Sequence, residues 1–312
     1  MKKLLGLVLG LMILMSACNM EKSDQKVVDL GISQIVEYEA LDESRTGFLQ
    51  ALKEGGYEDG KNLKVDYQNA QGDISLAQSI GKKFASDKKD MIFAISTPSA
   101  QGAFNATKDI PIMITAVTDP KKSGLSDGAK NISGTSDYLD IKNQINLIKN
   151  LIPDAKTIGI IYNTGEINSE LQVKELESKA SGYKIEKVGV TSINEIPSAI
   201  SSLTSKVDVI YAPTDQMIVS SLPVIVEKSK KYKIPVIAAE KGSVKNGALA
   251  TTGIDYEKLG YETGKMAVEV LKGKDISKLP IKTSSSTKIY INKDTAKYLG
   301  IKINLKDVEY VD

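Results

Sequence analysis

The sequence predicts an α/β protein built from two doubly wound lobes, each with a parallel sheet covered by helices on both faces. Short runs rich in Val and Ile alternate with longer amphipathic stretches from Val27 onward, and the runs are apolar at consecutive positions. Such runs are typical of strands buried on both faces, and their alternation with helices predicts parallel sheets. The alternation occurs twice, on either side of a polar segment at residues 119–138, which predicts two lobes.

The first half contains four predicted strands and three predicted helices. Each strand is a short apolar run between polar or turn-forming residues, at 27–35, 63–67, 91–95 and 112–116. Helices are predicted where apolar residues recur three and four apart, near 41–55, 75–87 and 98–108.

The second half repeats this order. Its predicted strands are at residues 157–162, 184–190, 207–211, 236–239 and 248–252. Its predicted helices lie near residues 139–151, 168–181, 194–204 and 215–231. A second break follows Thr252, where Gly253-Ile254-Asp255 leads into a predicted helix at 256–271, and Gly273 and Pro280 mark a third break.

The first eighteen residues have the layout of a secretory signal. Lys2 and Lys3 precede an apolar run at 4–15, and small residues stand directly before Cys18, the only cysteine. This order resembles the lipobox of bacterial lipoproteins, which implies that residues 1–17 are removed and that Cys18 carries lipid. An ordinary signal peptide or a membrane anchor is the alternative, although the run is shorter than the ~20 residues of a spanning helix. Residues 18–26 are polar and predict a lipidated tether.

Composition excludes several classes of function. Without residues 1–17 the chain has 41 − 2 = 39 cations and 39 acids, so its formal net charge is zero and nucleic acid is not an expected partner. The absence of histidine removes the commonest general base and metal ligand, and one cysteine allows neither a disulfide framework nor a thiolate metal site. We therefore expect no catalytic residues, no metal and no cofactor.

The segment Ser96-Thr97-Pro98-Ser99 is a candidate anion site. A predicted strand ends here, Thr97 stands where an N-cap belongs, and Pro98 takes the first helical position that it favours. The N–H groups of Ser99 and Ala100 would then point outward and, with the hydroxyls and the helix dipole, would suit a carboxylate or phosphate. The alternative is a plain N-cap that serves only its own helix.

Loops after the other strands should gather at the same sheet edge, because ligands of open α/β sheets bind there. These loops supply further candidate ligand-binding residues, which are Gln34, Glu37, Thr118, Asp119, Tyr162, Asn163, Thr214, Asp215 and Glu240.

A ligand that carries an ammonium group as well as a carboxylate would need an acidic acceptor opposite the carboxylate site. Asp119, Asp137, Asp215 and Glu240 are the candidates, and Asp215 is our first choice. The alternative for Asp215 is that it caps the helix beginning at Gln216, and Asp137 has the same ambiguity before the next predicted helix.

Arg45 and four tyrosines are further candidates. Arg45, the only arginine, either contacts a ligand carboxylate or pairs with Asp42 three residues earlier. The tyrosines could form the wall of a site for an aromatic or apolar ligand, and they are Tyr38, Tyr138, Tyr162 and Tyr211.

Five stretches together resemble one known family. They are SQIVE at 33–37, YQNAQGD at 67–73, AISTPSAQ at 94–101, TAVTDP at 115–120 and GIDY at 253–256. The chain is similar to the ABC-transporter substrate-binding lipoproteins with a type I periplasmic-binding-protein fold, especially the tryptophan/tyrosine-binding branch of Gram-positive bacteria.

This resemblance implies two lobes joined by a multi-strand hinge. The first lobe would comprise residues 27–135 and 254–280, and the second residues 136–253 and 281–312. It also implies a monomer, lipid-anchored on the extracellular face of the cell membrane, that passes an aromatic or other apolar L-amino acid to an ABC permease. A sensor module of the same fold, a sugar or nucleoside binder, and a lipid-anchored enzyme remain alternatives.

Overall fold

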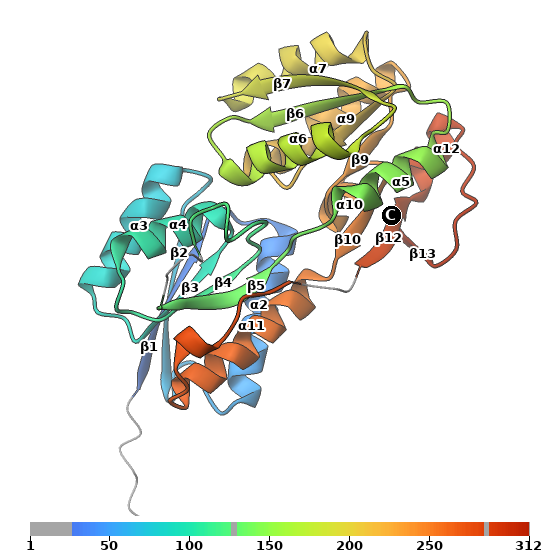
Figure 1. Ribbon diagram of the computed structural model, residues 1–312. Coiled ribbons are helices and arrows are strands. Elements are labelled where there is room, and N and C mark those ends of the chain that lie inside the picture. Colours follow the sequence, from blue (N-terminus) through green and yellow to red (C-terminus); the bar gives the residue numbers. More distant parts are fainter. Residues whose placement is uncertain (1–26, 126–129, 284–286, 312) are drawn as a thin grey trace, which may run out of the picture.

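The computed structural model describes residues 27–125, 130–283 and 287–311. The predicted signal segment, Cys18 and the tether at 18–26 lie outside these ranges. The described chain forms two α/β lobes, and it passes between them near the centre of the molecule (Figure 1). No helix within the described ranges is long and apolar enough to cross a membrane.

The first lobe contains a six-stranded parallel sheet with strand order β11-β5-β4-β3-β1-β2. Its strands are β1 (Val28–Gln34), β2 (Leu63–Asn69), β3 (Met91–Ile95), β4 (Ile112–Thr115), β5 (Ile132–Ser136) and β11 (Lys282–Thr283). Helices α2 (Glu39–Glu54) and α11 (Tyr256–Leu271) pack against each other, as do α3 (Ile74–Ser86) and α4 (Thr97–Ala106). The sheet lies between these two pairs of helices (Figure 1).

The second lobe contains a seven-stranded sheet with order β13-β12-β10-β9-β8-β6-β7. Its strands are β6 (Thr157–Asn163), β7 (Lys184–Val190), β8 (Val209–Ala212), β9 (Val236–Ala238), β10 (Ala250–Ile254), β12 (Thr287–Asn292) and β13 (Val308–Val311). Only β12 pairs antiparallel, with β10, among the ladders of this sheet.

Seven α-helices accompany this sheet within the described residues. They are α5 (Ile141–Leu151), α6 (Ile167–Lys179), α7 (Ile196–Thr204), α8 (Gln216–Ser220), α9 (Leu222–Lys231), α10 (Lys241–Lys245) and α12 (Lys293–Leu299). Two short 3₁₀ helices, η1 (Ile193–Glu195) and η2 (Ile276–Lys278), complete the described secondary structure. The predicted α/β class with two doubly wound lobes is therefore confirmed.

The chain crosses between the lobes three times, after β5, after β10 and after β11. These crossings differ slightly from the predicted boundaries. Ser136 and Ile254 end strands β5 and β10, and Lys282 pairs with Thr135 in the first-lobe sheet. The third crossing thus follows Thr283 rather than Pro280.

Prolines and polar strand residues explain where the predicted elements were wrong. The single helix expected at 215–231 is divided into α8 and α9, and Pro223 stands in the first turn of α9, where its missing N–H costs nothing. Strand β5 has the sequence ISGTS and was hidden in the polar segment 119–138. The C-terminal elements β12, α12 and β13 were not predicted at all.

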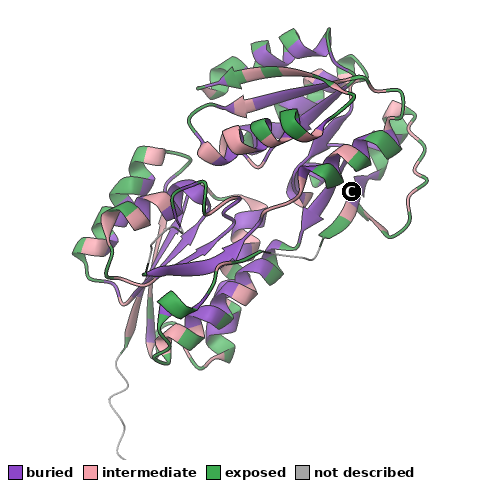
Figure 2. Cartoon of the chain, viewed as in Figure 1, coloured by how far each residue is buried: buried purple, intermediate pink, exposed green. Residues whose placement is uncertain are grey.

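Both lobes have their own apolar core between sheet and helices (Figure 2). In the first lobe the rings of Phe48 and Phe93 stack with centroids 3.7 Å apart, and both side chains are fully buried. Helix α11 comes late in the sequence but contributes Leu259 and Met266 to this first core. Because α11 packs in the first lobe, the chain has to cross from the second lobe to the first between β10 and α11, and this crossing is one strand of the hinge.

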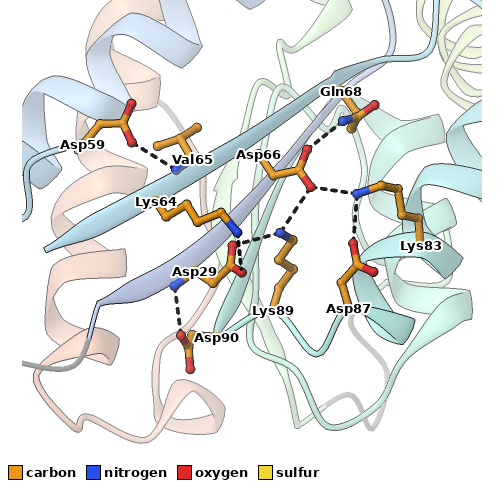
Figure 3. Close-up of polar contacts among 10 residues, drawn as sticks. All are labelled: Asp29, Asp59, Lys64, Val65, Asp66, Gln68, Lys83, Asp87, Lys89 and Asp90. Atoms are coloured by element: carbon orange, nitrogen blue, oxygen red, sulfur yellow. Dashed lines mark hydrogen bonds and ion pairs between the residues drawn. The ribbon is translucent and has the colours of Figure 1, made fainter. Parts of the chain in front are cut away.

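A charged network lies at the amino-terminal end of the first sheet (Figure 3). The Lys89 side chain is only 3% exposed, and its Nζ lies 2.8 Å from Asp29 Oδ1 on β1 and 3.1 Å from Asp66 Oδ2 on β2. Lys83 of α3 contacts the same Asp66 oxygen at 2.7 Å and also Asp87 at 2.8 Å. This network ties two strands and a helix together at the end of the lobe where β1 begins.

Candidate ligand-binding cleft

A small cavity of about 30 Å³ lies between the lobes, where the loops after the strands meet. Its lining combines residues from both lobes. The first lobe contributes Tyr38, Ala40, Leu41, Ser96, Thr97, Ala116, Thr118 and Asp137, the second contributes Asn168, Thr214, Gln216, Val219 and Glu240, and Tyr256 lies at the start of α11. Six of the predicted residues belong to this lining, namely Ser96, Thr97, Thr118, Asp137, Thr214 and Glu240.

A larger cavity lies elsewhere in the described chain. A groove of about 600 Å³ on the second lobe is lined by α5, β12 and the segment that leads into β13. Its α5 residues Asn143, Asn146 and Asn150 are exposed to solvent, and among the described residues its lining contains no buried polar atom without a partner. The inter-lobe cavity is smaller, but it contains the buried and unsatisfied polar groups that a ligand would need.

Two residues of the cleft have unusual backbone conformations. Ser96 has φ 84° and ψ 161°, and Ala116 has φ 53°, although neither is glycine. They follow β3 and β4, and both line the cleft. Backbone strain of this kind costs about 1–3 kcal/mol per residue and often occurs where a ligand is bound.

Helix α4 begins at Thr97, one residue earlier than predicted. Ser96, not Thr97, is the N-cap residue, and its side chain makes no capping hydrogen bond. The Ser96 hydroxyl is buried and has no hydrogen-bond partner in the described chain. The N–H of Ala100, which we expected to point outward, donates to Ser96 O at 3.0 Å within the helix.

The candidate anion site thus contains fewer residues than predicted. Thr97 lines the cleft at the first position of α4, whereas Ser99 is fully buried and is not part of the lining. The uncapped helix start retains its positive end of the dipole, and the free Ser96 hydroxyl lies beside it. These groups suit a carboxylate.

Asp137 is a buried acid with one free oxygen. Its Oδ2 accepts a 2.8 Å hydrogen bond from the Tyr256 hydroxyl, while its Oδ1 has no hydrogen-bond partner among the described residues. Burial raises the pKa of Asp137, and the hydrogen bond from Tyr256, the nearby Thr118 hydroxyl and the backbone N–H of Asp137 oppose this rise. A buried carboxylate with an open acceptor position suits a cationic donor.

Two amide side chains present further acceptors from the second lobe. Asn168 Oδ1 and Gln216 Oε1 are buried and have no partner in the part of the chain that is described. Asn168 Nδ2 donates to Thr214 O at 2.8 Å and to Glu166 Oε2 at 3.2 Å. The cleft therefore contains one carboxylate oxygen and two amide oxygens that lack donors.

Tyr38 and Glu240 connect the lobes across the cleft. The Tyr38 hydroxyl, at the start of α2, donates to Glu240 Oε1 at the start of α10. Glu240 also accepts from the N–H groups of Gly242 and Ser243, both at 2.5 Å, so it caps α10. Burial and the neighbouring Glu240 carboxylate raise the pKa of Tyr38, which keeps it a hydrogen-bond donor. A more exposed ion pair between Glu39 and Lys245 lies beside this contact.

Asp215, our first choice for the ammonium acceptor, is not part of the cleft lining. It is fully buried, and its Oδ1 accepts from the N–H of Ile218, so it caps α8 as the alternative reading had it. Its Oδ2 accepts from the N–H of Asn163 and from the Ser169 hydroxyl, both at 2.5 Å. Both oxygens are occupied by the protein itself, and the open acceptor belongs to Asp137.

Six other predicted residues also lie outside the lining, namely Gln34, Glu37, Ser99, Asp119, Tyr162 and Asn163. Gln34 is buried between Asp42 and Arg45, whose Nη1 donates to Gln34 Oε1 at 2.7 Å. Arg45 also pairs with Asp42 at 3.1 Å, which confirms the structural reading of this arginine. The structure does not bring these residues into the cavity.

The remaining predicted residues outside the cavity have other surroundings. Glu37 is exposed, Asp119 accepts from the N–H of Lys122 at 3.0 Å, and Tyr162 packs against the second-lobe core. Among the four candidate wall tyrosines only Tyr38 lines the cavity. The hydroxyls of Tyr138 and Tyr211 instead contact Glu175 and Gln172.

Sequence reasoning missed several lining residues. Asn168 lies in the first turn of α6 and Gln216 begins α8, and both helices follow strands, which is the signal that could have identified these residues. Tyr256 follows the helix cap Asp255 at the hinge, and the apolar residues Ala40, Leu41 and Val219 gave no signal of their own. Within the described ranges, no group of three acidic, histidine or cysteine residues could hold a metal ion.

Comparisons with known proteins agree with this arrangement. A family model described as ABC transporter substrate binding protein matches residues 29–308. A tyrosine-binding protein of Clostridioides difficile (strain R20291) is 50% identical over 300 residues, which cover 94% of this chain and 87% of that protein.

Two solved structures are also similar. The ligand-free, open structure of a substrate-binding protein with adhesive properties from Clostridium difficile has 52% identity and a TM-score of 0.71, and the match covers 92% of this chain and 99% of that one. A domain in complex with L-Trp from Streptococcus pneumoniae has 38% identity and a TM-score of 0.87, and the match covers 91% and 99%. This chain belongs to the ABC transporter substrate-binding protein family.

Proposed function

We propose that this protein binds an aromatic L-amino acid, such as L-tyrosine or L-tryptophan, between its lobes and delivers it to an ABC permease. One observation carries the proposal. Asp137 Oδ1, Asn168 Oδ1 and Gln216 Oε1 are buried acceptors without donors in the described residues, and all three side chains line the same cleft. A ligand ammonium group has three N–H donors and one positive charge, so it would satisfy this set of acceptors.

The opposite end of such a ligand fits the start of α4. The Ser96 hydroxyl has no partner in the described chain, and the helix start has no side-chain cap. A carboxylate there would accept hydrogen bonds and would be favoured by the helix dipole. Acceptors for an ammonium and donors for a carboxylate in one cleft support an amino acid over a sugar or a nucleoside.

The choice of an aromatic side chain is supported by the lining and by the relatives. Ala40, Leu41, Ala116 and Val219 provide apolar surface, and the rings of Tyr38 and Tyr256 lie among them. One relative is described as tyrosine-binding and another is described in complex with L-Trp.

The lobes have to separate before a ligand of this size can enter. The cavity of about 30 Å³ is far smaller than the roughly 300–1,000 Å³ of typical small-molecule pockets. The TM-score is 0.87 with the L-Trp complex but 0.71 with the ligand-free, open relative, although the latter is closer in sequence. This difference supports a closed arrangement of the lobes in the present structure.

We further propose that residues 1–17 are removed and that Cys18 anchors the protein through lipid on the extracellular face of the cell membrane. The order of basic, apolar and small residues before Cys18 supports this step. The protein would act as a monomer. It would also release its ligand chemically unchanged, since the chain has no histidine to act as a general base and a relative is described as a tyrosine-binding protein.

Titration calorimetry with L-tyrosine, L-tryptophan and their deaminated analogues tests the proposal. In Asp137→Asn, we expect affinity for the amino acids to fall at least about tenfold, because a charged hydrogen bond is worth roughly 1.5–3 kcal/mol. Affinity for 3-(4-hydroxyphenyl)propionate, which lacks the ammonium group, should stay within about twofold.

Asp119→Asn is the matched control, because Asp119 lies outside the cleft and should leave both affinities unchanged. Mass spectrometry of solute released from freshly purified protein identifies the natural ligand. A sugar or nucleoside in that fraction, or equal losses for both ligand types in Asp137→Asn, would refute the amino-acid proposal.

A further inference from the structure

We infer that Glu166 is a positioning residue that holds Asn168 with its side-chain oxygen, rather than its amide nitrogen, toward the ligand ammonium group. The inference rests on the proposed function, because it concerns the polarity of the same cleft. Glu166 itself is buried and is not part of the cleft lining. It would therefore act through Asn168 and Gln216, which do line the cleft.

The Glu166 carboxylate accepts hydrogen bonds from two asparagine side chains and from the start of α8, and not from the backbone N–H groups of its own helix. Glu166 stands at the N-cap position of α6, but its carboxylate caps no N–H of α6. Oε2 accepts from Asn168 Nδ2 at 3.2 Å, and Oε1 accepts from Asn163 Nδ2 at 3.3 Å and from the backbone N–H of Gln216 at 3.2 Å. The carboxylate thus connects the start of α6 with the start of α8.

This arrangement determines which atom Asn168 presents to the cleft. Its Nδ2 donates to both Glu166 Oε2 and Thr214 O, so both amide hydrogens have acceptors. The oxygen of an amide points away from its nitrogen, and Asn168 Oδ1 is the buried atom left without a donor. Two acceptors that fix the nitrogen therefore also fix the oxygen as the group available to a ligand.

Gln216 depends on the same carboxylate through its backbone. Its N–H bond to Glu166 holds the first residue of α8, and its side-chain oxygen is another buried acceptor without a donor in the described chain. Glu166 therefore supports both amide acceptors from the second lobe. The starts of α6 and α8 also bring their positive dipole ends toward this carboxylate.

The charge of Glu166 fits a cationic ligand. Burial, followed by the charge of Asp215, raises the pKa of Glu166 to about 8, so the empty site favours its protonated form more than usual. An ammonium group in the nearby cleft favours the carboxylate form. Ligand binding would therefore strengthen the contacts that orient Asn168.

Glu166→Gln tests the inference with a side chain of the same size. A carboxamide has one acceptor oxygen and one NH₂ group, so it cannot accept from all three present donors. Its NH₂ group would face either Asn168 Nδ2 or the Gln216 N–H, and the orientation of the cleft acceptors would be lost. We expect affinity for L-tyrosine to fall about tenfold in calorimetry, with less than about twofold change for 3-(4-hydroxyphenyl)propionate.

Asp215→Asn is the matched control. Asp215 is a buried acid in the same region, and it makes no hydrogen bond to the side chain of Asn168 or Gln216. Its charge raises the pKa of Glu166, so its removal favours the Glu166 carboxylate and leaves the contacts that orient Asn168 in place. A structural disturbance should lower both affinities by similar factors and leave their ratio unchanged. A changed ratio in Asp215→Asn together with an unchanged ratio in Glu166→Gln would overturn the inference.

A double-variant cycle shows whether Glu166 acts through Asn168. In an Asn168→Ala background, Glu166→Gln should change the ratio by less than in the wild type, because the group it positions is gone. If Glu166→Gln does not fold, Glu166→Asp keeps the charge and both acceptor oxygens but withdraws them by one methylene, so the contacts to Asn168 and Gln216 lengthen and the ratio should still fall. Additive effects in the cycle would contradict the inference.

The same measurements separate the inference from the proposed function. Wild-type protein that binds neither L-tyrosine nor L-tryptophan would refute the proposed function. Wild-type binding with an unchanged ratio in Glu166→Gln and Glu166→Asp would leave the function standing and refute the role of Glu166.

Discussion

At the scale of single residues, Ser96 joins backbone strain with an unsatisfied hydroxyl. Its φ of 84° and ψ of 161° fall in a region that is almost restricted to glycine, at a cost of about 1–3 kcal/mol. Ser96→Gly should therefore raise the free energy of unfolding by about 1 kcal/mol, after the extra chain entropy of glycine is subtracted. The same change removes the buried hydroxyl and should weaken carboxylate ligands. Urea unfolding and calorimetry measure the two effects.

Ser96→Ala is the control for this prediction. It removes the hydroxyl but keeps a Cβ in the strained conformation, so affinity should fall while stability stays below that of Ser96→Gly. If Ser96→Gly and Ser96→Ala have equal stability, the strain at this position is not released by glycine and the prediction is wrong.

Glu166 also predicts a dependence of stability on pH. Because its pKa is raised from 4.5 to about 8 by burial and by Asp215, the folded protein holds this proton more tightly than the unfolded chain. The resulting stabilisation is present below about pH 4.5 and is lost as pH rises toward 8. The melting temperature of ligand-free protein should therefore fall between pH 5.5 and 8.5, and Glu166→Gln should reduce this fall. Equal falls in both proteins would contradict the assignment.

The sequence identified the sheet edge that forms the cleft, but it did not identify which acidic side chain has a free carboxylate oxygen there. Ser96 and Thr97 were identified because they follow a predicted strand, and Asp137 because it is an acid shortly before a predicted helix. The cleft includes all three. Asp137 and Asp215 look equivalent in the sequence, since each is an acid close before the start of a predicted helix. Only the fold distinguishes them: the oxygens of Asp215 accept from Asn163, Ser169 and Ile218, whereas Asp137 Oδ1 stays free in the described chain.

At the scale of helices and strands, hydrophobic periodicity found most elements but not those with unusual composition. Strand β5 is buried although it contains Ser133, Thr135 and Ser136, and their hydroxyls bond within the lobe. The close packing of α2 on α11 was also not evident from the sequence. A Cβ on Gly260 would lie 1.8 Å from the Ser44 carbonyl oxygen, so only glycine allows this approach. Such contacts join segments more than two hundred residues apart.

The charged network in Figure 3 predicts a measurable contribution to the stability of the first lobe. Lys89→Met would leave Asp29 and Asp66 facing each other without their shared cation. We expect a loss of about 2 kcal/mol in the free energy of unfolding, below the roughly 3–5 kcal/mol of fully buried pairs because both carboxylates are partly exposed. Urea unfolding measures the change.

Lys64→Met is the matched control for Lys89. Lys64 also pairs with Asp29, at 3.5 Å, but its side chain is 69% exposed, so its removal should cost less than about 0.5 kcal/mol. Similar losses in the two variants would show that burial of Lys89 does not matter.

At the scale of the whole molecule, the three crossings between the lobes followed from the family resemblance and not from periodicity. Local patterns identify strands, but they do not determine that α11 returns to the first lobe or that β11 pairs with β5. This topology places Tyr256, at the start of α11, against Asp137 at the end of the first-lobe sheet. The hinge thereby contributes directly to the ligand site.

The contact between Tyr38 and Glu240 makes a prediction about closure of the two lobes. Opening the cleft breaks this hydrogen bond, while the N–H groups of Gly242 and Ser243 remain bonded to Glu240 within the second lobe. A hydrogen bond to a charged group contributes roughly 1.5–3 kcal/mol, so Tyr38→Phe should shift the balance toward the open state about tenfold. The ring of Phe keeps the apolar contact and removes only the hydroxyl.

Small-angle X-ray scattering and calorimetry together test this prediction. Ligand-free Tyr38→Phe should have a larger radius of gyration than ligand-free wild type, and it should bind L-tyrosine and its deaminated analogue more weakly by the same factor, because closure serves both ligands equally. Glu39→Gln is the control: its ion pair with Lys245 also joins the lobes, but both side chains are more than one-third exposed, so its loss should change affinity less than about threefold. An unchanged radius of gyration in Tyr38→Phe, or a loss confined to the amino acid, would show that Tyr38 contacts the ligand rather than holding the lobes together.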